Sequence, residues 1–492
     1  MSIQDTLQAL DHLYTLFTCL THLLSTDSKP PIAIIGAGFS GLACAQLLTK
    51  ASFKPVIYES RNRTGGRVYT VPFSDGTADL GASWIHGRGP GAFDMQQWEG
   101  QENPIYQIAR ENGVETVKTW EGDREIEKQK LSWYRGGKVP YTHIHSLMIE
   151  MEDYLEDLQE DEDPILNGKS VEELLRAKFL SENPTQDDLD IFGFIMSYRW
   201  GQDYGADVSK FSARWQEVDA IFQGSEDIVP KGMCQITKIL ERGLDIRLGQ
   251  AVRKIDFSGN GVKVQIGDGQ EEIVDKVVVS VPLGVLKART INFEPELPEN
   301  FRQSLSRLGS GVLDKLILRF THCFWDHSLD WLNYIAPSDT PYIWTQTLNY
   351  CKFTGKPILI MFNCEQSAHH FATYTDEQLI ESAFDVLGKT FPEVNAKEHL
   401  VEYIRTNWTQ DPNAQMCYTY LGKEASPKDC ETLGKPVNGK VYFAGEHTSF
   451  EFIGTVNAAY ISGMKAGEKV IGEYVQSLYA LACCIAMIST IY

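Results

Sequence analysis

The amino-acid sequence predicts an α/β fold in which one chain forms two domains, and three observations lead to this expectation. A β-branched run at Pro31–Gly36, helical spacing of leucines across Phe39–Lys50 and a short strand at Pro55–Tyr58 form a β-turn-α-β unit. Such a unit is typical of a Rossmann-like domain built on a parallel sheet. Far downstream, alternating segments predict an antiparallel sheet in an α+β domain, at Lys315–Phe320, Asp330–Ile335, Tyr342–Leu348 and Ile358–Asn363.

The Rossmann-like domain is expected to be assembled from discontinuous segments, because its further elements lie far apart in the sequence. Strand and helix patterns that fit it occur at Val262–Ile266, Lys276–Val281, Lys440–Ala444 and Asn457–Val475. The first domain should therefore comprise residues 30–110, 227–300 and 430–475, and the second should comprise residues 111–226 and 301–429. Amphipathic helices of the second domain are predicted at Leu147–Asp163 and Val171–Leu180.

Composition narrows the classes of partner. The chain has 492 residues and a formal net charge of −21. Nucleic acid is excluded as a partner, because its phosphates would be repelled rather than neutralised. A negative field could concentrate small cations, although many proteins are simply acidic. The 10 cysteines form no CxxC pair, so reduced thiols are expected, with neither a zinc site nor a disulfide framework.

The two ends of the chain lie outside the expected domains. Residues 1–29 form an N-terminal extension in which Leu13–Leu24 predicts an amphipathic helix, because the first 28 residues contain no Lys or Arg to flank a leader. Residues 476–492 form an apolar tail that is short for a membrane span of about 20 residues. We expect a packed terminal segment and a cytoplasmic protein. The alternative is a C-terminal tail anchor, which would provide any membrane contact.

Three glycines and one carboxylate predict a dinucleotide site. Gly36, Gly38 and Gly41 form GxGxxG between the first strand and the helix. The first permits a tight turn, the second lets backbone approach a pyrophosphate, and the third lets the helix pack on the strand. Glu59 ends the second strand, where a carboxylate accepts hydrogen bonds from ribose hydroxyls.

The next segment indicates which dinucleotide binds. Arg61–Val68 reads RNRTGGRV, in which Gly65 and Gly66 permit close backbone approach and Arg67 offers a guanidinium to phosphate or ring oxygens. This placement resembles the second fingerprint of FAD enzymes of the amine oxidase class. The cofactor is therefore predicted to be FAD.

Four segments in order resemble the flavin-containing amine oxidase family, in its polyamine and spermine oxidase branch. They are DLGASWIHG at Asp79–Gly87, GSGVLDKLILRF around Lys315, WTQDPNAQMCYTY at Trp408–Tyr420 and VYFAGEHTS at Val441–Ser449. The resemblance extends from about Pro31 to Val475. It implies that Glu446 holds the ribityl chain, that Val252 contacts the adenine through its backbone, and that Trp408 lies in the cofactor site.

The resemblance also implies catalytic roles. The lysine that matches Lys315 holds a water against flavin N5, where electron density grows. Trp84 and His86 match positions that line the substrate tunnel, and a histidine there can hydrogen-bond a secondary amine. Tyr418 matches one side of an aromatic cage, and Thr455 stands where many relatives have the second aromatic residue.

One cysteine leaves the attachment of the flavin open. Cys417-Tyr418 reproduces the pair through which monoamine oxidases hold FAD covalently. The other motifs resemble the polyamine branch, in which FAD is not covalently held. We therefore expect non-covalent FAD with Cys417 as a packing residue, and a thioether link as the alternative.

The expected reaction is FAD-dependent oxidation of a small amine, such as spermine, spermidine or an N-acetyl derivative, with molecular oxygen as acceptor. Hydride transfer to N5 gives an imine, then an aldehyde, a shorter amine and hydrogen peroxide. The alternatives are a monoamine oxidase, an L-amino-acid oxidase using Arg199 or Arg214, and a non-catalytic FAD-fold scaffold like the Rab escort proteins. No long insertion supports a histone-demethylase-like role, and no metal site is predicted.

Overall fold

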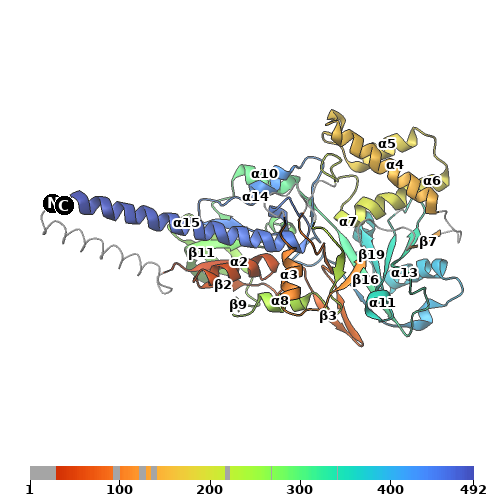
Figure 1. The fold of residues 1–492 in the computed structure, drawn as a ribbon, viewed down its shortest axis with the longest axis horizontal. Coiled ribbons are helices and arrows are strands. Elements are labelled where there is room, and N and C mark those ends of the chain that lie inside the picture. The colour runs from red at the N-terminus through yellow and green to blue at the C-terminus, as the bar shows by residue number, and fades with distance from the viewer. Residues whose placement is uncertain are drawn as a thin grey trace.

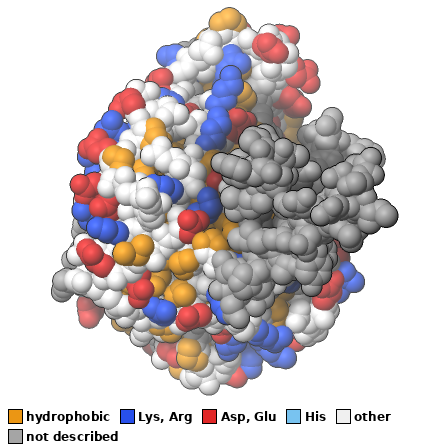
Figure 2. Space-filling view, turned by 90° about the vertical axis from the view of Figure 1, so that its left-hand side faces the viewer, with side chains coloured by type: hydrophobic (Ala, Val, Ile, Leu, Met, Phe, Trp, Pro, Cys, Tyr) orange, Lys and Arg blue, Asp and Glu red, His pale blue; other side chains and the backbone are white. Residues whose placement is uncertain are grey.

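The computed structural model of the protein has two lobes and one long C-terminal helix (Figure 1). It describes residues 29–91, 100–120, 129–133, 141–216, 222–267, 269–340 and 342–491. The expected helix at Leu13–Leu24 lies outside these residues. Acidic and basic side chains are interspersed over the described part of the face in Figure 2.

A five-stranded parallel sheet forms the centre of the first lobe. Its strand order is β22-β13-β1-β2-β9. The strands are β1 Ile32–Ile35, β2 Pro55–Tyr58, β9 Asp245–Arg247, β13 Lys276–Val279 and β22 Val441–Phe443. Segments that are far apart in the sequence thus lie side by side in one sheet, as the sequence predicted. The domain limits themselves stay a prediction.

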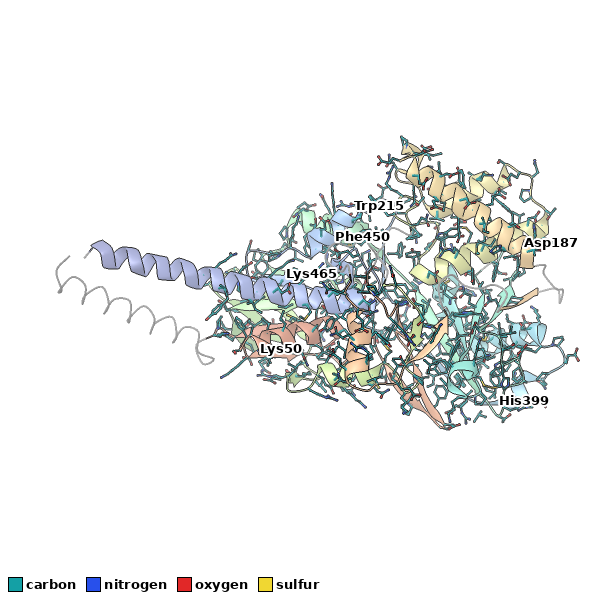
Figure 3. The ribbon with its side chains drawn as sticks, viewed as in Figure 1. Lys50, Asp187, Trp215, His399, Phe450 and Lys465 are labelled. Atoms are coloured by element: carbon teal, nitrogen blue, oxygen red, sulfur yellow. A yellow bond between two sulfur atoms is a disulfide. The ribbon has the colours of Figure 1, made fainter. Side chains whose placement is uncertain are left out.

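Helices α2 (Phe39–Lys50) and α15 (Val456–Ile491) pack against each other on this lobe (Figure 1). A glycine permits their close approach, because a Cβ on Gly463 would lie 2.1 Å from the Ser40 carbonyl oxygen. Lys50 and Lys465 mark the two helices in Figure 3. This packing holds the N-terminal end of α2, where the glycine loop ends.

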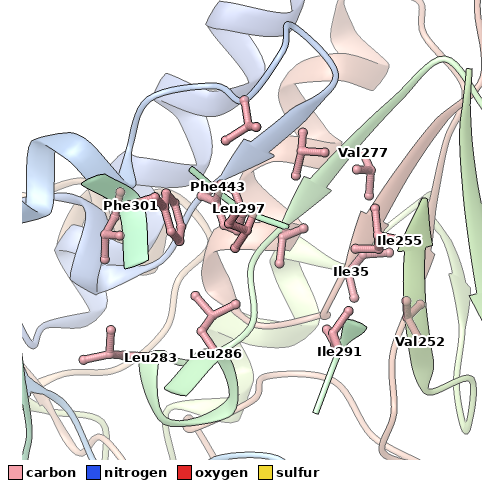
Figure 4. Close-up of a cluster of buried hydrophobic side chains, with 14 of the residues drawn as sticks. Ile35, Val252, Ile255, Val277, Leu283, Leu286, Ile291, Leu297, Phe301 and Phe443 are labelled. Carbon is pink, nitrogen blue, oxygen red and sulfur yellow. The ribbon is translucent and has the colours of Figure 1, made fainter. Parts of the chain in front are cut away.

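A four-stranded sheet packs against the face of the parallel sheet opposite to α2 and α15. Its order is β12-β11-β10-β14, with β10 Val252–Asp256, β11 Val262–Ile266, β12 Gln270–Val274 and β14 Asn292–Glu294. Figure 4 shows Val252 and Ile255 of β10 in the hydrophobic cluster that also contains Ile35 and Val277 of the parallel sheet. Burial of this cluster joins the two sheets into one core.

A six-stranded sheet forms the core of the second lobe, in the order β20-β16-β19-β18-β17-β7. Its strands are β7 Gln129–Trp133, β16 Leu313–Phe320, β17 Trp331–Ile335, β18 Gln346–Asn349, β19 Ile358–Cys364 and β20 Leu400–Arg405. Neighbouring strands are antiparallel except β7 and β17. The expected antiparallel sheet is confirmed, and Lys315 of β16 lies opposite Phe362 of β19.

Helices form the upper part of the second lobe around their own hydrophobic cluster (Figure 1). They are α4 Tyr141–Glu160, α5 Val171–Leu180, α6 Gln186–Ile195, a π-helical turn at Met196–Gly201 and α7 Gln202–Tyr204. Capping boxes start α5 at Ser170 and α6 at Thr185, since each hydroxyl accepts a backbone N–H three residues later. The predicted helices of this region are thus present.

Short elements connect the two lobes and complete their surfaces. The strands among them are β3 Thr70–Phe73, β4 Gly76–Asp79, β5 Trp84–Ile85, β6 Val117–Trp120, β8 Glu226–Ile228, β15 Gly309–Ser310 and β21 Thr419–Tyr420. The helices are α3 Pro104–Glu111, α8 Cys234–Leu240, α9 Leu283–Lys287, α10 Glu299–Arg307, α11 Tyr350–Thr354, α12 Glu365–Phe371, α13 Asp376–Thr390 and α14 Pro427–Leu433. Single 3₁₀ turns occur at Pro164–Leu166, Ala396–His399 and Glu446–Thr448. Strand β8 pairs with both β5 and β6, and so connects segments more than a hundred residues apart.

One pair of cysteines differs from the sequence-based expectation. The cysteines were expected to be reduced, yet Cys323 and Cys351 form a disulfide. Their separation of 28 residues carries no motif, and only the fold brings the β16–β17 loop to α11.

At the C-terminus, α15 extends past the rest of the lobe (Figure 1), and the side chains of the expected packed tail lie outside the described part. Among the described residues, no helix has the length and apolarity to cross a membrane. The cellular location of the protein stays a prediction.

Candidate active site

The glycine loop opens one end of a large cavity. Gly36 has a φ of +105°, which favours glycine, and its N–H donates to the Tyr58 carbonyl at 2.9 Å. A Cβ on Gly41 would lie 2.0 Å from the Gly36 carbonyl oxygen, so this glycine lets α2 pack against the loop. A Cβ on Gly38 would meet nothing within 4 Å. Gly38 therefore presents bare backbone to the cavity at the N-terminal end of α2.

The second glycine pair lies directly against this loop. Gly65 donates its N–H to the Ala37 carbonyl at 2.8 Å and has a φ of +94°. A Cβ on Gly66 would lie 3.3 Å from Gly38 Cα. The RNRTGGRV segment thus completes the floor of the same cavity, as its sequence position predicted.

Glu59 is buried at the end of β2. Its Oε2 accepts the Ala37 N–H at 2.7 Å, and its Oε1 accepts the Arg61 N–H at 2.8 Å. The carboxylate therefore fixes the glycine loop relative to β2 and also lines the cavity. Its predicted contact with a ribose would use the same oxygens.

Arg67 and Glu446 form an ion pair across the cavity. Arg67 Nη1 lies 3.0 Å from Glu446 Oε1 and also donates to the Cys417 carbonyl. Glu446 is buried, and its Oε2 accepts the backbone N–H groups of Thr419 and Gly454 at 3.3 and 3.2 Å. These contacts hold both side chains in place between the two lobes.

Lys315 lies on β16 with only 5% of its surface exposed. Its Nζ donates to the Asp79 carbonyl at 3.1 Å, the Gly81 carbonyl at 2.6 Å and the Ser83 hydroxyl at 2.7 Å. An ammonium has three donors, and these three protein groups accept all of them. Lys315 thus fixes the segment that leads to Trp84, whose ring centroid lies 5.8 Å from Nζ.

Burial changes the proton affinity of this lysine and of its acidic neighbour. Desolvation lowers the pKa of Lys315 to about 8, and the Asp79 carboxylate opposes that shift. Desolvation also raises the pKa of Asp79 to about 6, against the effects of Thr70, Lys315 and Met233. Between these pH values both groups are charged, so the pair is an ammonium and a carboxylate near neutral pH.

The predicted aromatic and histidine residues line the opposite end of the cavity. Trp84 lies on β5, with its ring centroid 6.3 Å from that of Phe362 on β19. His86 follows β5, and its Nδ1 lies 2.7 Å from Glu226 Oε2 on β8. Antiparallel pairing of Trp84 with Ile228 brings these two side chains together.

The two predicted cage positions have distinct structural roles. Tyr418 donates its hydroxyl to the Gln202 carbonyl at 2.8 Å, which holds the ring between the lobes. Thr455 precedes α15, and its hydroxyl accepts the Ala458 N–H at 3.1 Å. Thr455 is thus an N-cap as well as a cavity residue.

Cys417 and Trp408 lie in the wall between these groups. Burial raises the pKa of the Cys417 thiol above its usual range, so the side chain is a neutral thiol. The Trp408 backbone N–H donates to Asp314 Oδ1 at 3.0 Å, and its indole N–H donates to the Leu80 carbonyl at 3.3 Å. Both residues are therefore fixed by packing and backbone contacts.

One cavity of about 810 Å³ contains nearly all of the predicted site residues. Those that line it are Gly36, Gly38, Glu59, Gly65, Gly66, Arg67, Trp84, His86, Val252, Lys315, Trp408, Tyr418, Glu446 and Thr455. Gly41 packs behind the loop instead. Arg199 and Arg214, the residues nominated for a carboxylate substrate, are not part of the lining, and Arg199 is paired with Glu152.

The predicted site residues leave out several polar residues of the cavity wall. Glu226 and Asp203 add carboxylates to it. The Asn457 amide Nδ2 is buried and has no hydrogen-bond partner among the described residues, although the side chain lines the cavity. An asparagine at the start of a predicted helix beside a matched motif was the available signal for Asn457. No local pattern marks Glu226 or Asp203.

A glycine loop between strand and helix, opening into a cavity that ends at a buried lysine and aromatic rings, defines a dinucleotide-dependent oxidoreductase. The profile of the family described as flavin containing amine oxidoreductase matches residues 39–471. The chain belongs to this family, and it is an FAD-dependent amine oxidase.

Individual relatives agree with this assignment. Polyamine oxidase 3 of Oryza sativa subsp. japonica is 32% identical over 454 residues, which cover 89% of each chain. Polyamine oxidase 2 of Arabidopsis thaliana is 32% identical over 450 residues, 89% of this chain and 88% of that one. Human lysine-specific histone demethylase 2 is 28% identical, but the match covers only 54% of it. The solved structure of putrescine oxidase bound to putrescine has a TM-score of 0.71 and 19% identity over 90% of this chain and 99% of that chain. It shares the fold.

Proposed function

We propose that this amine oxidase acts on a polyamine and that its cavity places the amine beside Trp84, His86 and Tyr418. One observation carries the proposal: the cavity that begins at the glycine loop also contains two carboxylates, Glu226 and Asp203, at the other end. A polyamine has several ammonium groups along an apolar chain. Separated carboxylates beside aromatic rings match that pattern of charge.

The residues of the first lobe fit FAD. Gly38 leaves room for a pyrophosphate at the N-terminal end of α2, where N–H groups favour negative charge. Arg67 brings a guanidinium to the same cavity, and the unpaired Asn457 amide offers a donor to a ring carbonyl. We assign the cofactor to Gly36, Gly38, Gly41, Glu59, Gly65, Gly66, Arg67, Val252, Trp408 and Glu446.

We propose that FAD is held without a covalent bond. Cys417 is a buried neutral thiol, and nucleophilic attachment needs a thiolate. Its Sγ packs against Gly205, since a Cβ there would lie 3.1 Å away. Packing therefore accounts for this cysteine.

The residues of the second lobe orient the substrate and control its protonation. Bound FAD would supply the two-electron oxidation of the amine, by accepting hydride from the α-carbon, and molecular oxygen would take the electrons in turn; water would hydrolyse the imine product. The amine nitrogen must be neutral before the neighbouring α-carbon can lose hydride, because its lone pair forms the new C–N double bond. His86 can accept the amine proton, because the Glu226 carboxylate 2.7 Å from Nδ1 favours a proton on that nitrogen and leaves Nε2 as acceptor in the neutral ring. Trp84 and Tyr418 hold the apolar chain, and Lys315 fixes the segment that carries Trp84.

The decisive experiment uses purified holoenzyme under anaerobic conditions. The protein should be yellow, and spermine, spermidine or N-acetylspermine should bleach it. Bleaching by monoamines alone would contradict a polyamine substrate, and bleaching by amino acids alone would support the L-amino-acid oxidase alternative. A colourless protein that does not take up added FAD would contradict the cofactor site itself.

A further inference from the structure

A second cluster of chemically active side chains lies away from the FAD cavity. The ligand atoms of Cys323, His327 and Cys351 all lie within 4.8 Å of one another. Within the described ranges, no other group of three histidine, cysteine or acidic residues is arranged in this way. None of the three lines the cavity. The cluster therefore requires an explanation separate from amine oxidation.

The fold holds the three residues together through a network around Asn349. Cys323 and His327 lie in the loop between β16 and β17, and Cys351 lies on α11. The buried Asn349 side chain accepts the Trp325 indole N–H at 2.7 Å and donates to the Leu329 carbonyl at 2.7 Å. Lys352 donates to the Ser328 carbonyl at 2.9 Å. The loop is thus attached to α11 on both sides of His327.

The cluster lies towards the outer surface of the second lobe. The Thr321 N–H donates to the His399 carbonyl at 2.9 Å, and Figure 3 places His399 at the end of the molecule opposite α15. Cys351 is buried, Cys323 is half-buried and His327 is exposed. A small ion could therefore enter from the side of His327.

We propose that Cys323, Cys351 and His327 bind a Zn²⁺ ion when the two cysteines are reduced. Two thiolates and one imidazole are ligands that Zn²⁺ prefers, and a water can complete the tetrahedron at the exposed side. Zn–S bonds of about 2.3 Å place two sulfurs about 3.8 Å apart. The cysteine Cα atoms are 7.2 Å apart, beyond the range of about 4.4–6.8 Å usual for disulfides, and two ligands of one ion tolerate this spacing.

The disulfide and the metal site exclude each other, which makes the site sensitive to oxidation. A sulfur in a disulfide has no thiolate charge with which to bind the ion. Oxidation by hydrogen peroxide converts the two zinc-bound thiolates, one peroxide and two protons into one disulfide, two waters and free Zn²⁺. The structure, with Cys323 bonded to Cys351, corresponds to the oxidised state.

The test is zinc binding by the full-length holoenzyme in two redox states. Protein reduced with a phosphine and freed of metal with a chelator should bind one equivalent of Zn²⁺, measured by competition with a chromophoric indicator. Protein with an intact disulfide should bind none at this site. Cobalt(II) added to the reduced protein should produce thiolate-to-metal charge-transfer absorption. One equivalent of peroxide should then release the zinc.

Variants identify the ligands. Cys323→Ser and His327→Asn should each weaken zinc binding by about 100-fold or more, since each removes one of three protein ligands. Cys234→Ser and His145→Asn are matched controls at a free cysteine and an exposed histidine, and they should bind zinc normally. The proposal is overturned if reduced wild-type protein binds no zinc, if oxidised protein binds it equally well, or if the ligand variants retain wild-type affinity. Wild-type protein in its two redox states decides the matter even where a cysteine variant folds poorly.

Discussion

His86 and Glu226 lie against each other in the wall of the cavity, with 2.7 Å between Nδ1 and Oε2. The pairing has two consequences. It favours the tautomer in which Nδ1 carries the proton, and it places a carboxylate charge beside the substrate end of the cavity. Substitution can separate these two effects.

Glu226→Gln should raise KM for polyamines about tenfold, which corresponds to about 1.4 kcal/mol, and should change kcat little. An amide oxygen at this position also favours a proton on Nδ1, so the tautomer is kept, but the charge that attracts an ammonium is lost. Steady-state peroxide release with a polyamine and with a small monoamine would measure the effect.

The matched control for this change is Glu299→Gln on the exposed surface of α10. That variant has the same change of net charge away from the cavity and should have wild-type KM. An unchanged polyamine KM in Glu226→Gln would show that this carboxylate does not attract the substrate.

The sequence predicted the cofactor end of the site better than the substrate end. Gly36, Gly38 and Gly41 act through local backbone geometry, so their spacing alone determines their roles. Glu226 faces His86 only because β5 pairs with β8, and this contact joins segments that no local pattern links. Long-range pairing of short strands is the physical reason why Glu226 was missed.

Two other structural features were missed, for different reasons. The Cys323–Cys351 disulfide was not expected, because it depends on a loop and a helix meeting at one end of a sheet. Thr455 was interpreted only as a cage position, although a threonine directly before a helix is typical of an N-cap. The disulfide could be found only from the fold, whereas the N-cap could be predicted from the sequence.

Lys315→Met should retain FAD but slow flavin reduction or reoxidation by about a hundredfold or more. The substitution removes a buried charge and leaves the acceptors at Asp79, Gly81 and Ser83 without their donor. Stopped-flow absorbance of the holoenzyme would measure the two half-reactions separately.

The control for Lys315→Met is Lys389→Met on the surface of α13, which should have normal rates. Ser83→Ala, which removes only one acceptor of Lys315, should have an intermediate effect. Rates near wild type in Lys315→Met would remove this lysine from the chemistry.

Lys315 should also make stability depend on pH in the alkaline range. Its pKa is about 8 in the folded protein and about 10.4 in the unfolded chain, so the unfolded state binds more protons between these values. The free energy of unfolding should therefore rise with pH in this window, by at most about 1.4 kcal/mol per pH unit from this group. Asp79 is ionised throughout, because its pKa is about 6.

Urea unfolding of wild type and Lys315→Met across this window would test the dependence. As the pH increases, the free energy of unfolding of wild type should rise relative to that of Lys315→Met. A difference that stays constant with pH would mean that Lys315 does not titrate there.

Thr455→Ala should lower the free energy of unfolding by about 1 kcal/mol, because it removes the hydroxyl that caps α15. Thr455→Ser keeps the cap and should be close to wild type. Thermal unfolding of both variants with FAD bound would measure the cap. Equal losses of stability in the serine and alanine variants would assign the effect to the methyl group instead.

Cys417→Ser should leave FAD binding and turnover near wild type. The thiol is buried and neutral, and its carbonyl, which a serine keeps, is the group that accepts the Arg67 hydrogen bond. Acid precipitation of wild-type protein should release all of the flavin into the supernatant, since no thioether holds it. Flavin that stays in the pellet of wild type but leaves that of Cys417→Ser would establish the covalent link, and it would require that the cavity lower the pKa of this thiol when FAD is bound.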